Sequence, residues 1–149
     1  MEKTNFLLAK TEINPVTVLP GWYVAVIDGK QATTLKAFYE QIAQALDFPE
    51  EFSHDLESFD EMINDLDWIE EDKVAIYIRN SNEWLTREKS DDRLLTIIDL
   101  LDATAEDWKW MDEEEEEDVA RKELLIVIED TPRIRTLLED QEIPFGMLD

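Results

Sequence analysis

Three short apolar segments, each rich in β-branched residues, constrain the fold of this 149-residue chain more than any other feature. They lie at residues 22–27, 73–79 and 123–129, and each is predicted to be a buried strand. Strands that are apolar throughout and that alternate with helices are typical of a mostly parallel sheet covered on both faces. We therefore expect an α/β fold, with a small three-stranded parallel sheet and helices packed on both of its faces.

Four helices are expected between and after these strands. The first lies within residues 33–49, with Thr33 or Thr34 as its N-cap and Pro49 as its stop. The third and fourth lie at residues 91–108 and 131–141, and the fourth begins with a threonine N-cap followed by proline. The tract at 111–123 is acidic and of low complexity, and we expect a solvated loop or a frayed helix end, with 112–118 mobile.

The second helix, within residues 55–66, follows a possible N-cap at Ser53 or Asp55. Its apolar residues recur at helical spacing and are expected to face the core: Leu56, Phe59, Ile63 and Leu66. Glu57, Glu61 and Asp65 are then expected to follow one another along the outward face. Like charges one turn apart destabilise a helix by about 0.2–0.5 kcal/mol per pair, so folding alone does not favour them.

This helix lies within a region of uncompensated negative charge. Residues 47–67 contain nine carboxylates, and residues 37–72 contain neither Lys nor Arg. The whole chain has a formal net charge of −24. Such a field attracts basic proteins and repels nucleic acid and anionic membranes. The 44% of apolar residues is nevertheless sufficient for a folded core.

The sequence gives little support to an enzyme. It has no Cys, its single histidine is His54, and its three Gly residues exclude a phosphate-binding loop. No cofactor or metal site is indicated, although an enzyme with a carboxylate-bound metal remains an alternative. His54 is interpreted as a polar residue of a loop or rim. No apolar run is long enough for a secretory signal or a membrane span, so we expect a cytoplasmic protein.

The segment "FPEEFSHDLESFDEMINDL", residues 48–66, resembles the barstar family of intracellular ribonuclease inhibitors. In that family an aromatic-rich "LPxYYGxNLDALxDxL" segment forms a loop and helix that dock into the active site of the target. The resemblance covers roughly residues 22–129, and we expect one domain of residues 1–149. In it, 1–21 is an N-terminal extension and 131–141 an extra C-terminal helix.

The resemblance implies an acidic inhibitor that blocks the basic cleft of a ribonuclease or nuclease toxin. An immunity protein that is a monomer when free fits this implication. Where the family has two aromatics, this chain has Glu51 and Phe52, and where it has two aspartates, Glu57 and Glu61. The alternative is a nucleic-acid mimic that binds a basic protein without enzymatic activity. The expected partner-binding residues are Glu51, Phe52, His54, Asp55, Glu57, Asp60, Glu61 and Asp65.

Overall fold

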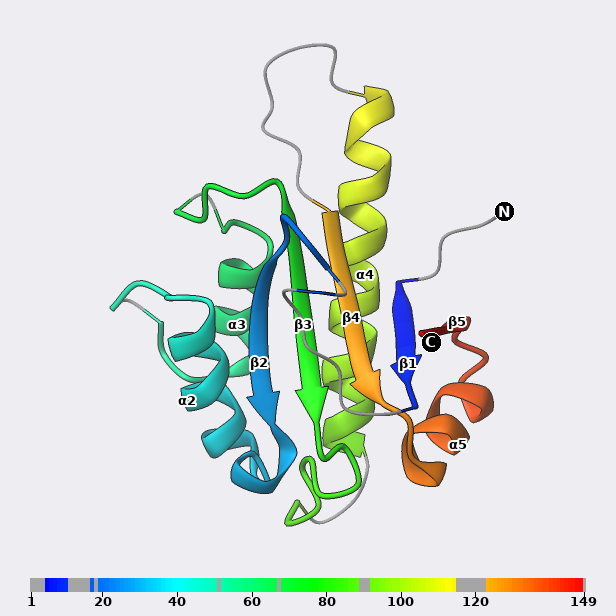
Figure 1. Cartoon of the computed structure of the whole chain (residues 1–149). Helices are drawn as coiled ribbons and strands as arrows, with labels where there is room; N and C mark the ends of the chain where they lie inside the picture. The colour runs from blue at the N-terminus through cyan, green and yellow to red at the C-terminus, as the bar shows by residue number, and fades with distance from the viewer. Residues whose placement is uncertain are drawn as a thin grey trace.

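The computed structural model of the chain describes residues 5–10, 17, 19–50, 52–66, 68–88, 92–114 and 123–148. Five strands form one sheet in the order β2-β3-β4-β1-β5, and every neighbouring pair is parallel (Figure 1). The strands are β1 (Phe6–Ala9), β2 (Tyr23–Asp28), β3 (Lys73–Arg79), β4 (Glu123–Glu129) and β5 (Phe145–Leu148).

The three predicted strands are confirmed as β2, β3 and β4, but the prediction of a three-stranded sheet is wrong. The segment expected to be an N-terminal extension contributes β1, which lies inside the sheet. Phe6 of β1 pairs with Ile126 of β4 on one side and with Phe145 of β5 on the other. Neither β1 nor β5 exceeds four residues, so each is too short to be recognised without its neighbours.

The four predicted helices are present as α2 (Leu35–Ala45), α3 (Leu56–Ile63), α4 (Asp92–Glu114) and α5 (Pro132–Asp140), and a short 3-10 helix, η1 (Gly29–Gln31), follows β2. Three of the α-helices begin with a side-chain cap. Thr34, Asp55 and Thr131 accept hydrogen bonds from the backbone N–H groups of Ala37, Ser58 and Ile134.

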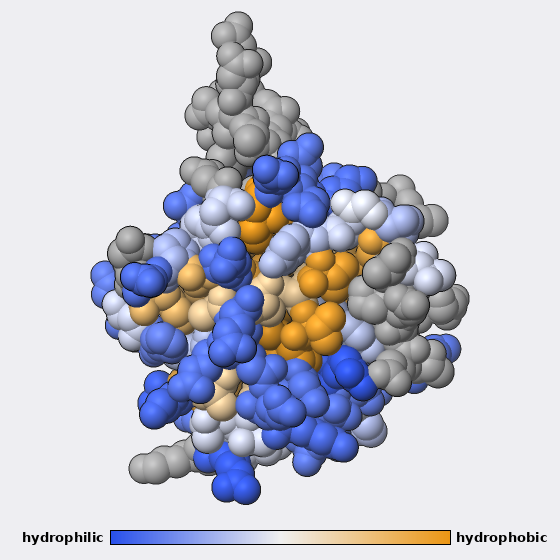
Figure 2. All heavy atoms as spheres, turned by 60° about the vertical axis from the view of Figure 1, so that its left-hand side comes forward, coloured by the Kyte–Doolittle hydropathy of each residue, from blue (hydrophilic) through white to orange (hydrophobic). Residues whose placement is uncertain are grey.

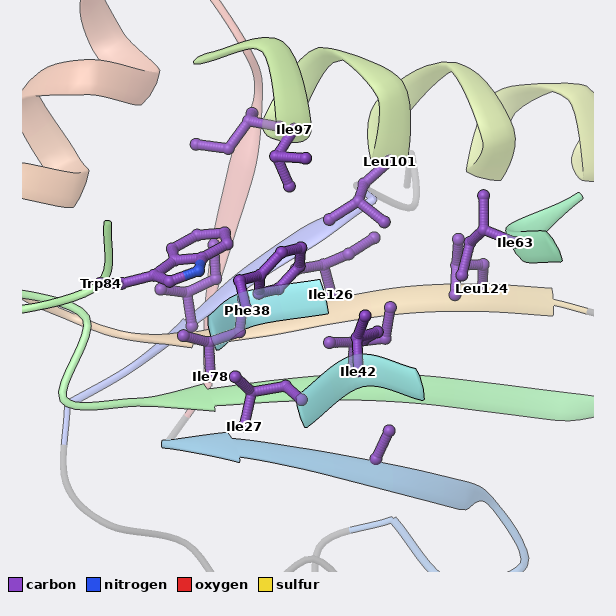
Figure 3. Packing of buried hydrophobic residues seen from close by; sticks show 14 of the residues in the cluster. Ile27, Phe38, Ile42, Ile63, Ile78, Trp84, Ile97, Leu101, Leu124 and Ile126 are labelled. Carbon is purple, nitrogen blue, oxygen red and sulfur yellow. The ribbon is translucent and has the colours of Figure 1, made fainter. Parts of the chain in front are cut away.

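All four α-helices pack on the same face of the sheet. Their buried side chains join those of Ile27, Ile78 and Ile126 in one core (Figure 3). On the opposite face Leu19 packs with Ala75, Tyr77 and Val127, and the partly buried Trp22 adjoins them. The expectation of helices on both faces is therefore wrong for α2–α5. Leu19 and Trp22, which precede β2, contribute to the cover of this second face.

Polar contacts join the carboxyl ends of three neighbouring strands. The backbone N–H of Asn80, after β3, donates to Oε1 of Glu129 on β4 at 2.5 Å. The side chain of Asn80 donates to Oδ1 of Asp28 on β2 at 2.7 Å. We call Asp28, Asn80 and Glu129 the strand-end network. Gly29 lies against it so closely that an added Cβ would be 2.2 Å from the carbonyl oxygen of Asn80, which excludes every larger residue.

The start of the acidic tract is helical, because α4 extends to Glu114. Residues 115–118, which complete the predicted mobile loop, lie outside the described residues. Within the part of the chain that is described, no helix is long and apolar enough to cross a membrane.

Candidate partner-binding face

The loop before α3 is held by two hydrogen bonds to Ser58, the third residue of the helix. The backbone N–H of Ser58 donates to Oδ1 of Asp55 at 2.8 Å, which makes Asp55 the N-cap. The hydroxyl oxygen of Ser58 accepts from the backbone N–H of Ser53 at 3.0 Å. Asp55 therefore has a structural role as well as an exposed position in the predicted site.

Between these two bonds lies His54, with a backbone φ of 59°. This left-handed conformation is uncommon for a residue with a side chain, so it requires support from its surroundings. Part of that support is the ring of Phe52, whose centroid is 4.8 Å from that of the imidazole. His54 itself is exposed, in agreement with its interpretation as a rim residue.

Phe52, which was expected to contact the partner, is only 6% exposed. Its ring packs edge-on against Phe48 at 4.9 Å and against Tyr39 at 5.9 Å. The family pattern places an aromatic residue here, but the pattern alone does not say on which side of the loop it lies. In the free protein, Phe52 anchors the loop to the core.

The outward side of α3 carries Glu57, Asp60 and Glu61, all exposed, and we call these three residues the acidic face. Asp60 is partly engaged, because Nδ2 of Asn64 donates to its Oδ1 at 2.7 Å. Among the residues that the structure describes, the side chains of Glu57 and Glu61 have neither a hydrogen bond nor an ion-pair partner. They lie one helical turn apart, so they repel each other in the free protein.

The predicted inward stripe of α3 is only partly correct. Phe59 and Ile63 are fully buried, but Leu56 is 40% exposed at the first helical position. The helix ends at Ile63, earlier than expected, so Leu66 is buried from a following turn, where its φ is 52°. Leu56 is thus an exposed apolar neighbour of the acidic face. The helical spacing had wrongly predicted that it would face the core.

The early end of α3 also changes the outward row of carboxylates. Asp65 follows the C-cap residue Asn64, so it does not continue the row of Glu57 and Glu61 along the helix. It is nevertheless exposed. Glu51, the remaining predicted contact, lies outside the described residues.

The pKa of Tyr39, on α2, is shifted by charged side chains of this region. Burial raises the pKa of Tyr39, and the charge of Asp55 raises it further, followed by that of Glu88. The charge of Arg93, in the first turn of α4, lowers the same pKa. Side chains from the loop before α3, from α4 and from the residues after β3 are therefore close enough to act on one phenol.

Seen from the side of α2 and β2, the molecule is largely hydrophilic around a central apolar area (Figure 2). Exposed large apolar residues are few among those described: Val26, Leu56 and Met147. No group of three His, Asp or Glu side chains in the described ranges is arranged to hold a metal ion.

The fold and this region define an α/β protein with an acidic helix that is capped by a side chain and exposed at the surface. A family model described as Barstar (barnase inhibitor) matches residues 22–122. Because the match covers more than half of the chain, the protein belongs to the barstar family. None of the curated proteins matches it. The match includes α3 and the loop before it, but it excludes β1, β4, α5 and β5.

Proposed function

We propose that the chain is a protein inhibitor, not an enzyme, which binds the basic active-site cleft of a ribonuclease or nuclease toxin with its acidic face. The observation that carries this proposal is the pair Glu57 and Glu61, whose exposed side chains have no partner among the described residues, on a helix that belongs to the family-matched region. Carboxylates at such positions can replace the phosphates of a nucleic acid in a cleft lined with Arg and Lys.

The energetics of the two states favour this role. In the free protein the repulsion between Glu57 and Glu61 costs only about 0.2–0.5 kcal/mol. In a complex each carboxylate can form charge-assisted hydrogen bonds with a cation from which water has been removed. The negative field of the chain also accelerates the encounter with a positively charged partner.

The proposed contact surface consists of the acidic face together with exposed residues next to it. Asp55 and His54 lie on the loop before α3, and Leu56 adds an apolar contact beside them. Glu51 and Asp65 stay as predicted contacts. We expect the inhibitor to act in the cytoplasm, as an immunity protein against its target, and to be a monomer when free.

Titration of barnase, the ribonuclease named in the family description, tests the proposal. Barnase hydrolyses RNA in the assay, and the purified chain is added up to a molar excess. We expect full inhibition near a 1:1 ratio, and much weaker inhibition by the chain with both Glu57→Gln and Glu61→Gln. The doubly substituted chain keeps the size and shape of both side chains, so it is the matched control for charge.

Lysozyme, a basic protein that does not cleave RNA, separates this function from the alternative of a general nucleic-acid mimic. The proposal predicts binding to barnase that persists at 0.5 M salt, where exposed charges are screened, and no comparable binding to lysozyme. Equal, salt-sensitive binding to both proteins, without inhibition of RNA cleavage, would support the mimic and reject the inhibitor.

A further inference from the structure

The loop that leads to the acidic face is closed into a ring by Ser58. The side chain of Ser58 is third in α3 and the residue is only 8% exposed. Its N–H donates to Asp55 and its hydroxyl oxygen accepts from the N–H of Ser53. These two hydrogen bonds enclose His54, the residue with the left-handed backbone. We call this arrangement the serine clip.

The serine clip differs from the usual capping box. In a capping box, the third helical side chain returns to the backbone N–H of the N-cap residue. Here it reaches two residues further back, to Ser53. The hydroxyl of Ser58 therefore contributes more than a helix cap, because it fixes the direction in which the preceding loop approaches the helix.

We propose that Ser58 is a positioning residue for partner binding, which keeps residues 53–57 in one conformation before the partner arrives. The inference rests on the proposed function of the acidic face. Ser58 is nearly buried, whereas Leu56 and Glu57, the first two residues of the helix, are exposed. A loop that is already ordered in the free protein loses less conformational freedom on binding, so affinity increases without a new contact.

The serine clip requires a hydrogen-bond acceptor on the side chain at position 58. Alanine keeps the Cβ atom and has a higher helix propensity than serine, but it removes the acceptor for the N–H of Ser53. Threonine keeps the hydroxyl and serves as the conservative variant. Thr131→Ala is the matched control, because it removes the hydroxyl cap of α5, which packs on the same face of the sheet as α3 but beside β1 and β5, far from α3 (Figure 1).

The experiment compares wild type, Ser58→Ala, Ser58→Thr and Thr131→Ala by two measurements. Amide hydrogen exchange at Ser53, followed by NMR in the free protein, reports the serine clip directly. We expect Ser58→Ala to accelerate amide exchange at Ser53 by about two- to ten-fold, which corresponds to the usual net contribution of one hydrogen bond. Affinity for barnase should fall by about three- to ten-fold in Ser58→Ala. Ser58→Thr should restore both values, and Thr131→Ala should change neither.

Three results would overturn the proposal. The first is unchanged exchange at Ser53 in Ser58→Ala. The second is faster exchange with unchanged affinity, which would make the order of the loop irrelevant to binding. The third is an equal loss of affinity in Thr131→Ala, which would reduce the effect to general destabilisation. If the wild-type chain does not inhibit barnase, the proposed function is rejected instead. The exchange rate at Ser53 is measured in the free chain, so it tests the serine clip independently of that result.

Discussion

Carboxylates in the strand-end network and carboxylates of the acidic face lie in the same small protein but differ in the partners they have. Asp28 and Glu129 accept hydrogen bonds from Asn80, and they connect β2, β3 and β4. Glu57 and Glu61 have no such partners among the described residues. The first pair is therefore used within the fold, and the second remains available to another molecule. Substitution should separate these roles, because loss of a carboxylate affects folding in one region and binding in the other.

Glu61→Ala should give the largest effect. In a complex the truncated side chain leaves a cation of the partner buried and unpaired, which costs roughly 2–5 kcal/mol of affinity, mainly through faster dissociation. That range is borrowed from measured interfaces, barnase–barstar among them. The free energy of unfolding should stay the same or rise slightly. Calorimetric titration with barnase and a thermal melt measure the two quantities. If Glu61→Ala does not fold, Glu61 has a structural role, and the two regions do not differ in the way described.

Glu129→Ala should produce the opposite pattern. Removing this acceptor leaves the backbone N–H of Asn80 without its 2.5 Å hydrogen bond, at a cost of about 1–3 kcal/mol of stability. The affinity of the folded fraction for barnase should not change. Glu129→Gln keeps an oxygen at the same position and is the control in urea denaturation. A loss of affinity without a loss of stability would transfer Glu129 to the binding surface.

Asp55 sharpens the comparison because it belongs to both categories. Asp55→Ala removes the N-cap of α3 and should cost about 0.5–2 kcal/mol of stability. Asp55→Asn keeps an equally good capping oxygen while it removes the charge. It should therefore retain stability and lose affinity for barnase, an effect visible in the association rate at low salt. Equal stability of both variants would mean that the cap contributes nothing.

Tyr39→Phe tests the combined effect of burial and of the charge of Asp55 on the phenol of Tyr39. An unfolded tyrosine ionises with a pKa of 10.0, whereas burial and then Asp55 raise the pKa of Tyr39 in the folded protein. The phenol therefore contributes stability that is complete below pH 10 and is lost as the pH rises through the folded pKa. The substituted protein should lose less stability than wild type between pH 9 and pH 11 in urea denaturation. Parallel declines in the two proteins would contradict this.

The smallest effect is expected from five simultaneous serine substitutions at residues 113–117. These glutamates lie at the end of α4 and beyond it, away from the acidic face in sequence. Their replacement should leave stability unchanged, or raise it by a few tenths of a kcal/mol through lower repulsion. A thermal melt measures the stability of the substituted protein, and a titration with barnase measures its affinity. A loss of affinity as large as that of Glu61→Ala would place the binding surface elsewhere.

Local patterns were sufficient to predict the central strands, the helices and their caps. Val74, Ile76 and Ile78 lie in the apolar middle of a seven-residue strand, and Thr131 with Pro132 marks the start of α5 unambiguously. Strand β1 could not be predicted, because its four residues become a strand only through pairing with distant parts of the chain. The absence of α2–α5 from the second face is likewise a tertiary property, since an apolar strand does not specify what covers it.

The candidate site was predicted in outline from its charge, and its errors have local causes. Spacing placed Leu56 inward, but the first residue of a short helix has no preceding turn to hold it against the core. An aromatic residue before a helix can face either way, and Phe52 faces inward here. The role of Ser58 has a weak signal in the sequence, because a serine three residues after an N-cap also occurs in helices without such a contact.

The position of β1 has a consequence for the order of events during synthesis. A chain leaves the ribosome at about 5–20 residues per second, so Phe6 waits roughly 6–24 s before its partner Ile126 has been made. Strands β2 and β3 can pair much earlier. Until Ile126 has been made, nascent Phe6–Ala9 is an apolar segment without its neighbouring strands. The residues that form α3, with its carboxylates, are all synthesised before Ile126. Strand β1 is thus translated before either of the two strands that pair with it.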